Sequence, residues 1–308
     1  MTFVITNEDP VPNGAVSEWL TAADRTRFRV ARFAPPNTSR GTVVVLNGRT
    51  EFIEKYFEVI RNLHERDYTV ATLDWRGQGM SDRPLTSRHK GHVENFDLYV
   101  SDLRQTMVAF VEPNCPAPYR LLCHSMGGNI GMRYLGEFPD SCESAVFSAP
   151  MWGIGKFART PKLLRLVGGA TNVLRLGTSY IPGGGDYSES DRKFEGNVLT
   201  HDPERFARFV AQVKAQPQLE LGAPTFGWAR QGIISMETIH APGFPEAIHT
   251  PIRVCTASTE SLVSVEAQRI VANRLPNGEQ VIIEGAKHEL LMEIDDYRDQ
   301  IFAVFDAL

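Results

Sequence analysis

Ser125 has the sequence setting that most clearly predicts chemistry. It closely follows the apolar run Tyr119 to Cys123 and precedes a helix-forming stretch that starts at Met126. A strand that turns sharply into a helix at a serine lifts the hydroxyl above the sheet edge as a nucleophile. Gly127 fits the spacing Gly-x-Ser-x-Gly, where a β-carbon would collide between helix and strand. Cys123 replaces the first glycine of that pattern, and a serine at a helix start can also be a simple N-cap.

A serine hydroxyl is a weak nucleophile at neutral pH and needs a histidine as general base. His288 comes shortly after Val281-Ile282-Ile283, the last strand-like run of the chain, so it falls in a loop that can reach over Ser125. We therefore predict His288 as the base. A single histidine is more often structural than catalytic, and that alternative stays open.

The histidine in turn needs a carboxylate that holds its ring and stabilises the imidazolium. The residues after the predicted strand Ser144 to Phe147 contain no acid up to Gly153. The loop after Ile252 to Thr256 contains one, Glu260. We predict Glu260 as the third member of a triad, with a surface glutamate as the alternative.

Acyl transfer also requires donors for a tetrahedral oxyanion. The N–H of Met126, directly after Ser125, is one predicted donor. The second is the N–H of Arg49, in the turn Asn47-Gly48-Arg49-Thr50-Glu51 that follows another strand. Main-chain donors depend on geometry rather than on side-chain type, so the identity of residue 47 does not exclude this role.

Short β-rich runs alternate with helical stretches along the chain, which predicts an α/β fold with a mostly parallel sheet flanked by helices. The predicted strands are Arg27 to Phe33, Thr42 to Leu46, Tyr68 to Leu73, Tyr119 to Cys123, Ser144 to Phe147, Ile252 to Thr256 and Gln280 to Ile283. The predicted helices are Glu54 to Glu65, Asn95 to Val111, Met126 to Phe138, Val265 to Asn273 and Tyr297 to Leu308. The first strands are too close in sequence for a crossover helix, which predicts an antiparallel edge.

The alternation stops once, between residues 150 and 251. An excursion of this length is too long for a plain loop, so we predict a mainly helical lid over 151–250, inserted into a core formed by 1–150 and 251–308. The first part of this lid carries five basic residues and no acid: Lys156, Arg159, Lys162, Arg165 and Arg175. With apolar residues between them, they could rest on anionic lipid headgroups. The alternative is a solvated helix face whose apolar stripe packs on the core.

Composition limits the classes of partner and compartment. The chain has 308 residues, 42% of them hydrophobic, and a formal net charge of −5. It has no long basic tract or nucleic-acid motif, so we expect no nucleic-acid partner. It also has no apolar run of membrane-spanning length and no signal-like start, and its four cysteines lack metal-site or Cys-x-x-Cys spacing. These features predict a cytoplasmic protein, which would be peripheral at the inner face of the membrane if the basic stretch binds lipid.

The motifs together resemble the α/β-hydrolase family that contains bacterial lysophospholipases and monoacylglycerol lipases. The resemblance rests on residues 47–51, 74–79 (Asp-Trp-Arg-Gly-Gln-Gly), 91–93, 124–128, 148–151 and 285–289, and within the predicted lid on 197–201 and 222–225. It implies an α/β-hydrolase fold and a carboxylic-ester hydrolase that acts on single-chain glycerolipids, with Ser125, Glu260 and His288 as the triad. No metal or organic cofactor is implied.

Two other readings stay open. One is a short-chain esterase or an acyltransferase of the same fold, in which an alcohol replaces water. The other is a hydrolase-fold binding protein without activity. A complete set of triad candidates in the expected chain order argues against the last of these.

Overall fold

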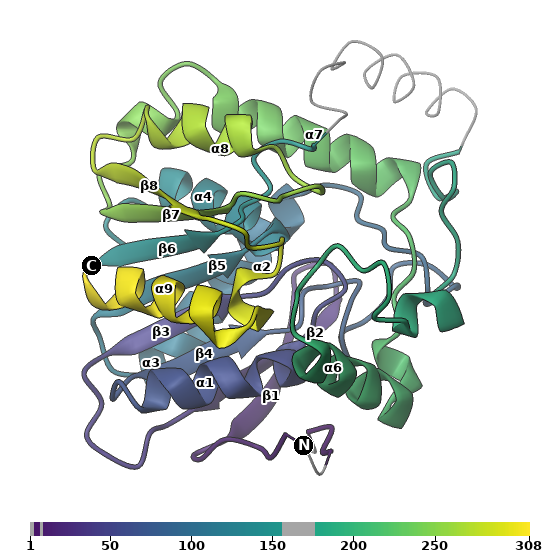
Figure 1. The fold of residues 1–308 in the computed structure, drawn as a ribbon, viewed down its shortest axis with the longest axis horizontal. Helices are drawn as coiled ribbons and strands as arrows, with labels where there is room; N and C mark the ends of the chain where they lie inside the picture. Colours follow the sequence, from purple (N-terminus) through teal and green to yellow (C-terminus); the bar gives the residue numbers. More distant parts are fainter. Residues whose placement is uncertain (1–2, 7–8, 156–175) are drawn as a thin grey trace.

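The computed structural model describes residues 3–6, 9–155 and 176–308. Its centre is an eight-stranded sheet with the order β1-β2-β4-β3-β5-β6-β7-β8 (Figure 1). Only the β1–β2 and β2–β4 pairs are antiparallel, as predicted for the first strands. The strands are β1 (Val16–Thr21), β2 (Arg27–Phe33), β3 (Thr42–Leu46), β4 (Thr69–Leu73), β5 (Tyr119–His124), β6 (Ser144–Ser148), β7 (Ile252–Ala257) and β8 (Gly278–Ile283).

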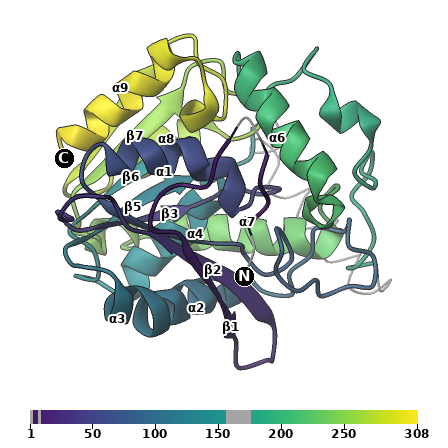
Figure 2. The ribbon, with the colours of Figure 1, turned by 90° about the horizontal axis from the view of Figure 1, so that it is seen from below.

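Helices cover both faces of the sheet (Figure 2). They are α1 (Phe57–His64), α2 (Asp97–Thr106), α3 (Glu112–Asn114), α4 (Met126–Glu137), α6 (Pro203–Ala215), α7 (Phe226–His240), α8 (Val265–Ala272) and α9 (Asp295–Asp306). One apolar core joins α1 and α9 to the sheet, and the other joins α2, α4 and α8 to its opposite face. Strands β3, β4 and β6 are buried along their whole length, as expected for strands covered on both sides. The predicted α/β-hydrolase architecture is confirmed.

Two of the predicted helices are less regular than expected. The stretch predicted from Glu54 begins with a 3₁₀ turn, Ile53–Tyr56, before α1. Helix α2 passes into a π-helical turn, Met107–Val111, which keeps Met107, Phe110 and Val111 buried. A hydrophobic pattern alone does not distinguish these wider and narrower turns from a regular helix.

The segment between β6 and β7 contains α6 and α7 and, in its described part, no strand. Helix α6 begins at Pro203, with the Asp202 carboxylate capping the N–H groups of Glu204 and Arg205. Helix α7 packs on α4, where Ser235 Oγ donates to Asn129 Oδ1 at 2.5 Å. The five basic residues of the predicted lid lie outside the described residues. Among the helices that are described, none is long and apolar enough to cross a bilayer.

Helix α6 lies beside α1 (Figure 1), and a cluster of charges around Glu58 connects the two helices. Arg205 of α6 donates from Nε and Nη2 to the two carboxylate oxygens at 2.9 and 2.7 Å, and Arg208 donates to Oε2 at 3.0 Å. Arg298 of α9 lies 3.6 Å from Oε1. Partial burial alone would raise the pKa of Glu58, but these arginines lower it to about 2.

This pKa shift predicts an acid-dependent contribution to stability. Because the folded-state pKa is lowered, the contribution is complete above the ordinary value of 4.5 and is lost as the pH falls toward 2. We expect Glu58→Gln to lower the free energy of unfolding at pH 7 by about 1–3 kcal/mol, measured by urea denaturation, and to flatten its dependence between pH 5 and 3. Glu279→Gln removes a largely exposed ion pair with Arg253 and should cost about 0–1 kcal/mol. Equal losses in the two variants would contradict this account.

Candidate active site

Ser125 occupies a strained turn between β5 and α4. Its backbone has φ +49° and ψ −112°, a conformation that L-residues rarely adopt and that is typical of a nucleophile presented by a tight elbow. The turn is held by main-chain bonds: the Ser125 N–H donates to Ser148 O at 3.1 Å, and its own carbonyl accepts from Met151 at 2.9 Å. At Gly127 a β-carbon would lie 2.1 Å from the carbonyl oxygen of Leu46, so the elbow requires glycine there, as predicted.

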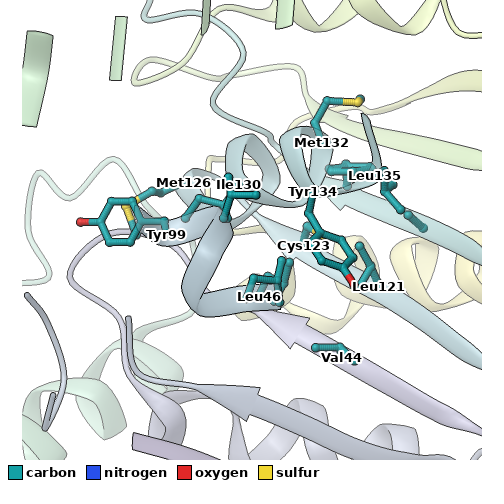
Figure 3. Packing of buried hydrophobic residues seen from close by; sticks show 14 of the residues in the cluster. Val44, Leu46, Tyr99, Leu121, Cys123, Met126, Ile130, Met132, Tyr134 and Leu135 are labelled. Atoms are coloured by element: carbon teal, nitrogen blue, oxygen red, sulfur yellow. The ribbon is translucent and has the colours of Figure 1, made fainter. Parts of the chain in front are cut away.

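Cys123 is accommodated at the elbow by a second glycine. The cysteine is fully buried beneath α4 (Figure 3). At Gly131, one helical turn after Gly127 in α4, a β-carbon would lie 2.8 Å from Cys123 Sγ. The motif normally has a glycine at position 123, which takes up little room under the helix. Here the glycine at position 131 leaves the room that the Cys123 side chain needs.

His288 lies in the loop after β8 and faces Ser125. Ser125 Oγ donates to His288 Nε2 at 3.0 Å, within the range of a catalytic hydrogen bond. The His288 side chain is 6% exposed, and its ring centroid is 4.9 Å from that of His124. The two residues predicted as nucleophile and base are brought together.

Glu260 lies in the loop after β7 and orients the other side of the His288 ring. His288 Nδ1 donates to Glu260 Oε2 at 2.6 Å. The second oxygen, Oε1, accepts from the N–H groups of Ser261, Leu262 and Val263 at 2.8, 2.7 and 3.3 Å. Burial alone would raise the pKa of Glu260, but the bonds from His288 and from these main-chain groups lower it. The carboxylate is therefore ionised at neutral pH, as an orienting acid must be.

The two predicted oxyanion donors are next to this chain of hydrogen bonds. Within the described residues, neither the N–H of Arg49 nor that of Met126 has a hydrogen-bond partner. The turn that contains Arg49 packs closely against the elbow, since a β-carbon at Gly48 would lie 3.0 Å from His124 Cδ2. Gln78 fixes this turn from behind by donating to Gly48 O at 2.7 Å and Glu51 O at 3.0 Å.

A buried charged cluster supports the same turn, and the motif analysis did not assign it a function. Glu51 Oε2 accepts from the N–H of Gly48 and from Tyr56 Oη, and Lys55 Nζ bridges Glu51 and Glu289 at 2.8 and 2.6 Å. Burial would raise the pKa of Glu51, but Lys55 and the neighbouring donors hold it at about 2. The signal in the sequence was the spacing of Glu51 and Lys55 by four residues, together with a glutamate directly after His288.

His124 is a neutral neighbour of His288. Its Nδ1 donates to Ser148 O at 3.1 Å, and burial lowers the pKa of His124 to about 4. It therefore adds no positive charge beside His288 at neutral pH. Such a charge would oppose formation of the His288 imidazolium.

Comparison with known proteins decides the family. The chain matches the family described as "Serine aminopeptidase, S33" over residues 37–295. The chain belongs to this family. Within it, the chain is 32% identical to "Lysophospholipase L2" of Escherichia coli (strain K12) over 288 residues, which covers 91% of the chain and 83% of that protein. It is 26% identical to "Monoacylglycerol lipase" of Mycolicibacterium smegmatis, with 85% of each covered. The predicted resemblance is confirmed.

Solved structures agree with this family assignment at the level of the fold. A soluble variant of monoglyceride lipase from Saccharomyces cerevisiae aligns with a TM-score of 0.72 at 19% identity, covering 99% of this chain and 97% of that one. A carboxyl esterase from Bacillus coagulans aligns with a TM-score of 0.75, also at 19% identity, covering 95% and 97%.

The pairing of Cys123 with Gly131 predicts a dependence between the two positions. Gly131→Ala alone should lower the free energy of unfolding by about 1–3 kcal/mol, because the new methyl group meets Cys123 Sγ. Cys123→Ala leaves a small cavity and should cost about 1 kcal/mol. The double variant should recover most of the loss seen in Gly131→Ala, and a thermodynamic cycle from denaturant unfolding measures the coupling. Strictly additive losses would show that the two side chains do not compete for space.

Proposed function

We propose that this protein hydrolyses the carboxylic ester of single-chain glycerolipids, of the lysophospholipase or monoacylglycerol lipase type, through an acyl-enzyme on Ser125. The observation that carries the proposal is the continuous hydrogen-bonded chain from Ser125 Oγ through the His288 ring to Glu260, at 3.0 and 2.6 Å. The names of the relatives support the substrate class, since they include lysophospholipases and monoacylglycerol lipases.

In the first half-reaction, Ser125 Oγ attacks the ester carbonyl carbon while its proton passes to His288 Nε2. The carbonyl oxygen becomes an oxyanion, which accepts from the N–H groups of Arg49 and Met126. Glu260 stabilises the imidazolium through the bond to Nδ1. The carbon–oxygen bond to glycerol then breaks, and His288 gives its proton to the leaving glycerol oxygen.

In the second half-reaction, a water molecule attacks the acyl-enzyme. His288 takes one proton from this water as the new carbon–oxygen bond forms, and the oxyanion returns to the same two donors. The bond to Ser125 Oγ breaks, and the proton on His288 returns to that oxygen. The free fatty acid leaves, and no metal or organic cofactor takes part in these steps.

The segment 151–250 is proposed to be the lid of this site. The location of α6 and α7 between β6 and β7 supports this, as do the contacts of Gly222 and Trp228 with Arg49. The cysteines of the chain are free and buried, which agrees with a reducing compartment, and we keep the cytoplasm as the proposed location.

The triad proposal predicts unequal effects of two substitutions. Ser125→Ala should lower kcat/KM for a monoacylglycerol by about 10⁵–10⁶-fold, and Glu260→Gln should lower it by about 10⁴-fold and leave measurable activity. Glu284→Gln is the matched control, an exposed acid in the same loop as His288, and should stay within threefold of the native rate. Native activity in Glu260→Gln would assign the acid elsewhere. Circular dichroism checks that each variant is folded.

We also propose that the basic residues of the lid bring the enzyme to an anionic membrane. The sequence supports this through the five positive charges and the absence of acid over 151–185. Each basic residue near an anionic surface contributes about 1 kcal/mol of attraction, which salt screens.

This proposal predicts that Arg159→Gln/Lys162→Gln/Arg165→Gln weakens binding to anionic vesicles by at least about tenfold in a sedimentation assay at low salt. Binding to neutral phosphatidylcholine vesicles should be unaffected. A triple variant that exchanges Arg25, Arg27 and Arg88, basic residues outside the lid, for Gln serves as the control for net charge. If both variants lose the same affinity, the membrane contact is not through the lid.

A further inference from the structure

Arg49 carries a guanidinium that meets no carboxylate in the described part of the chain. Its Nη2 donates to the main-chain oxygen of Gly222, and its Nε is buried without a partner. The guanidinium carbon lies 5.4 Å from the ring centroid of Trp228. A β-carbon at Gly91 would lie 2.3 Å from Nη2, so the charge rests on bare main chain there. Residues 156–175, which lie outside the description, contain no acid that could neutralise it.

Several other arginines of this protein have a different setting. Arg29, Arg76 and Arg205 each place their guanidinium against two or more carboxylates. Arg83 has no carboxylate partner among the described residues either, but Nε, Nη1 and Nη2 each donate to a main-chain oxygen. Arg49 has neither arrangement, and burial without an acid lowers its pKa to about 10. A buried N–H without an acceptor costs free energy. A ligand that supplies the acceptor removes this cost when it binds.

The location of Arg49 indicates which kind of ligand supplies this acceptor. The turn that contains it packs on His124 and Gly127, the residues on either side of the nucleophile elbow. Gly222 and Trp228 belong to the segment between β6 and β7, so the guanidinium lies where that segment meets the core. Arg49 is partly exposed. An ester whose carbonyl is held by the N–H of Arg49 is bound by the same residue that carries this guanidinium.

We infer that the Arg49 guanidinium binds the phosphodiester of the substrate's headgroup, and that Arg49 thereby selects lysophospholipids over neutral monoacylglycerols. This inference rests on the proposed function. Nε and Nη2 form one edge of a planar group, and that edge matches two oxygens of a phosphate. A monoacylglycerol offers only hydroxyl groups at this position, which leave the positive charge without a counter-ion.

The test compares two substrates with the same octanoyl chain, lysophosphatidylglycerol and monoacylglycerol, both below their micelle concentrations. The native enzyme should show the higher kcat/KM on the phosphodiester. Arg49→Gln should lower the ratio of the two values by about 10–100-fold, and Arg49→Lys, which keeps the charge but not the planar edge, by less. The ratio is the readout because a disturbed oxyanion turn slows both substrates alike and cancels.

Arg83→Gln is the matched control, because it removes a second arginine that has no carboxylate partner in the part of the chain that the structure describes. Its ratio should stay within threefold of the native one. Addition of inorganic phosphate to the monoacylglycerol assay should not raise its rate; activation would assign Arg49 to a free anion and overturn the inference. An unchanged ratio in Arg49→Gln, or no headgroup preference in the native enzyme, would also overturn it. If neither substrate is hydrolysed and Ser125 does not react with a fluorophosphonate, the proposed function itself has failed.

Discussion

The hydrogen-bonded chain from Ser125 through His288 to Glu260 is the interaction to which the rest of the site is fitted. Its members follow β5, β8 and β7, three parallel strands whose carboxyl ends meet at one edge of the sheet. The parallel order of these strands brings the loop of Ser125 to the loops of Glu260 and His288, although Ser125 lies more than a hundred positions before both in the sequence. Main-chain donors around Glu260, and the main-chain hydrogen bonds of Ser125 with Ser148 and Met151, then fix both ends of this hydrogen-bonded chain.

Close packing at the elbow imposes the second constraint. The strained Ser125 turn persists because β3 approaches α4 so closely that Gly127 cannot carry a side chain. The same approach brings the Gly48 turn beside His124. The N–H groups of Arg49 and Met126, which have no partner among the described residues, therefore lie near the Ser125 elbow. Behind that turn, Glu51, Lys55 and Glu289 form a buried ionic cluster, so the turn that contains Arg49 is held by charges that do not touch the proposed reacting atoms.

The fold and the core of the site could be predicted because they depend on local patterns. Strand and helix alternation indicated the parallel sheet, and the loops after predicted strands supplied Ser125, Glu260 and His288. Contacts between distant residues could not be predicted in this way. The fit of Cys123 to Gly131 depends on the rotation of α4, and the surroundings of the Arg49 side chain depend on where residues 91, 222 and 228 converge. The π-helical turn after α2 has no signature in the spacing of apolar residues.

The rate at which a fluorophosphonate labels the protein, followed by intact mass spectrometry and peptide mapping, tests the central claim most directly. The reagent reports whether Ser125 Oγ is activated by an imidazole, without any assumption about the natural substrate. Our account predicts one adduct, on Ser125, and a labelling rate reduced by at least about a thousandfold in His288→Ala. Labelling of another residue, or an equal rate in His288→Ala, would contradict it.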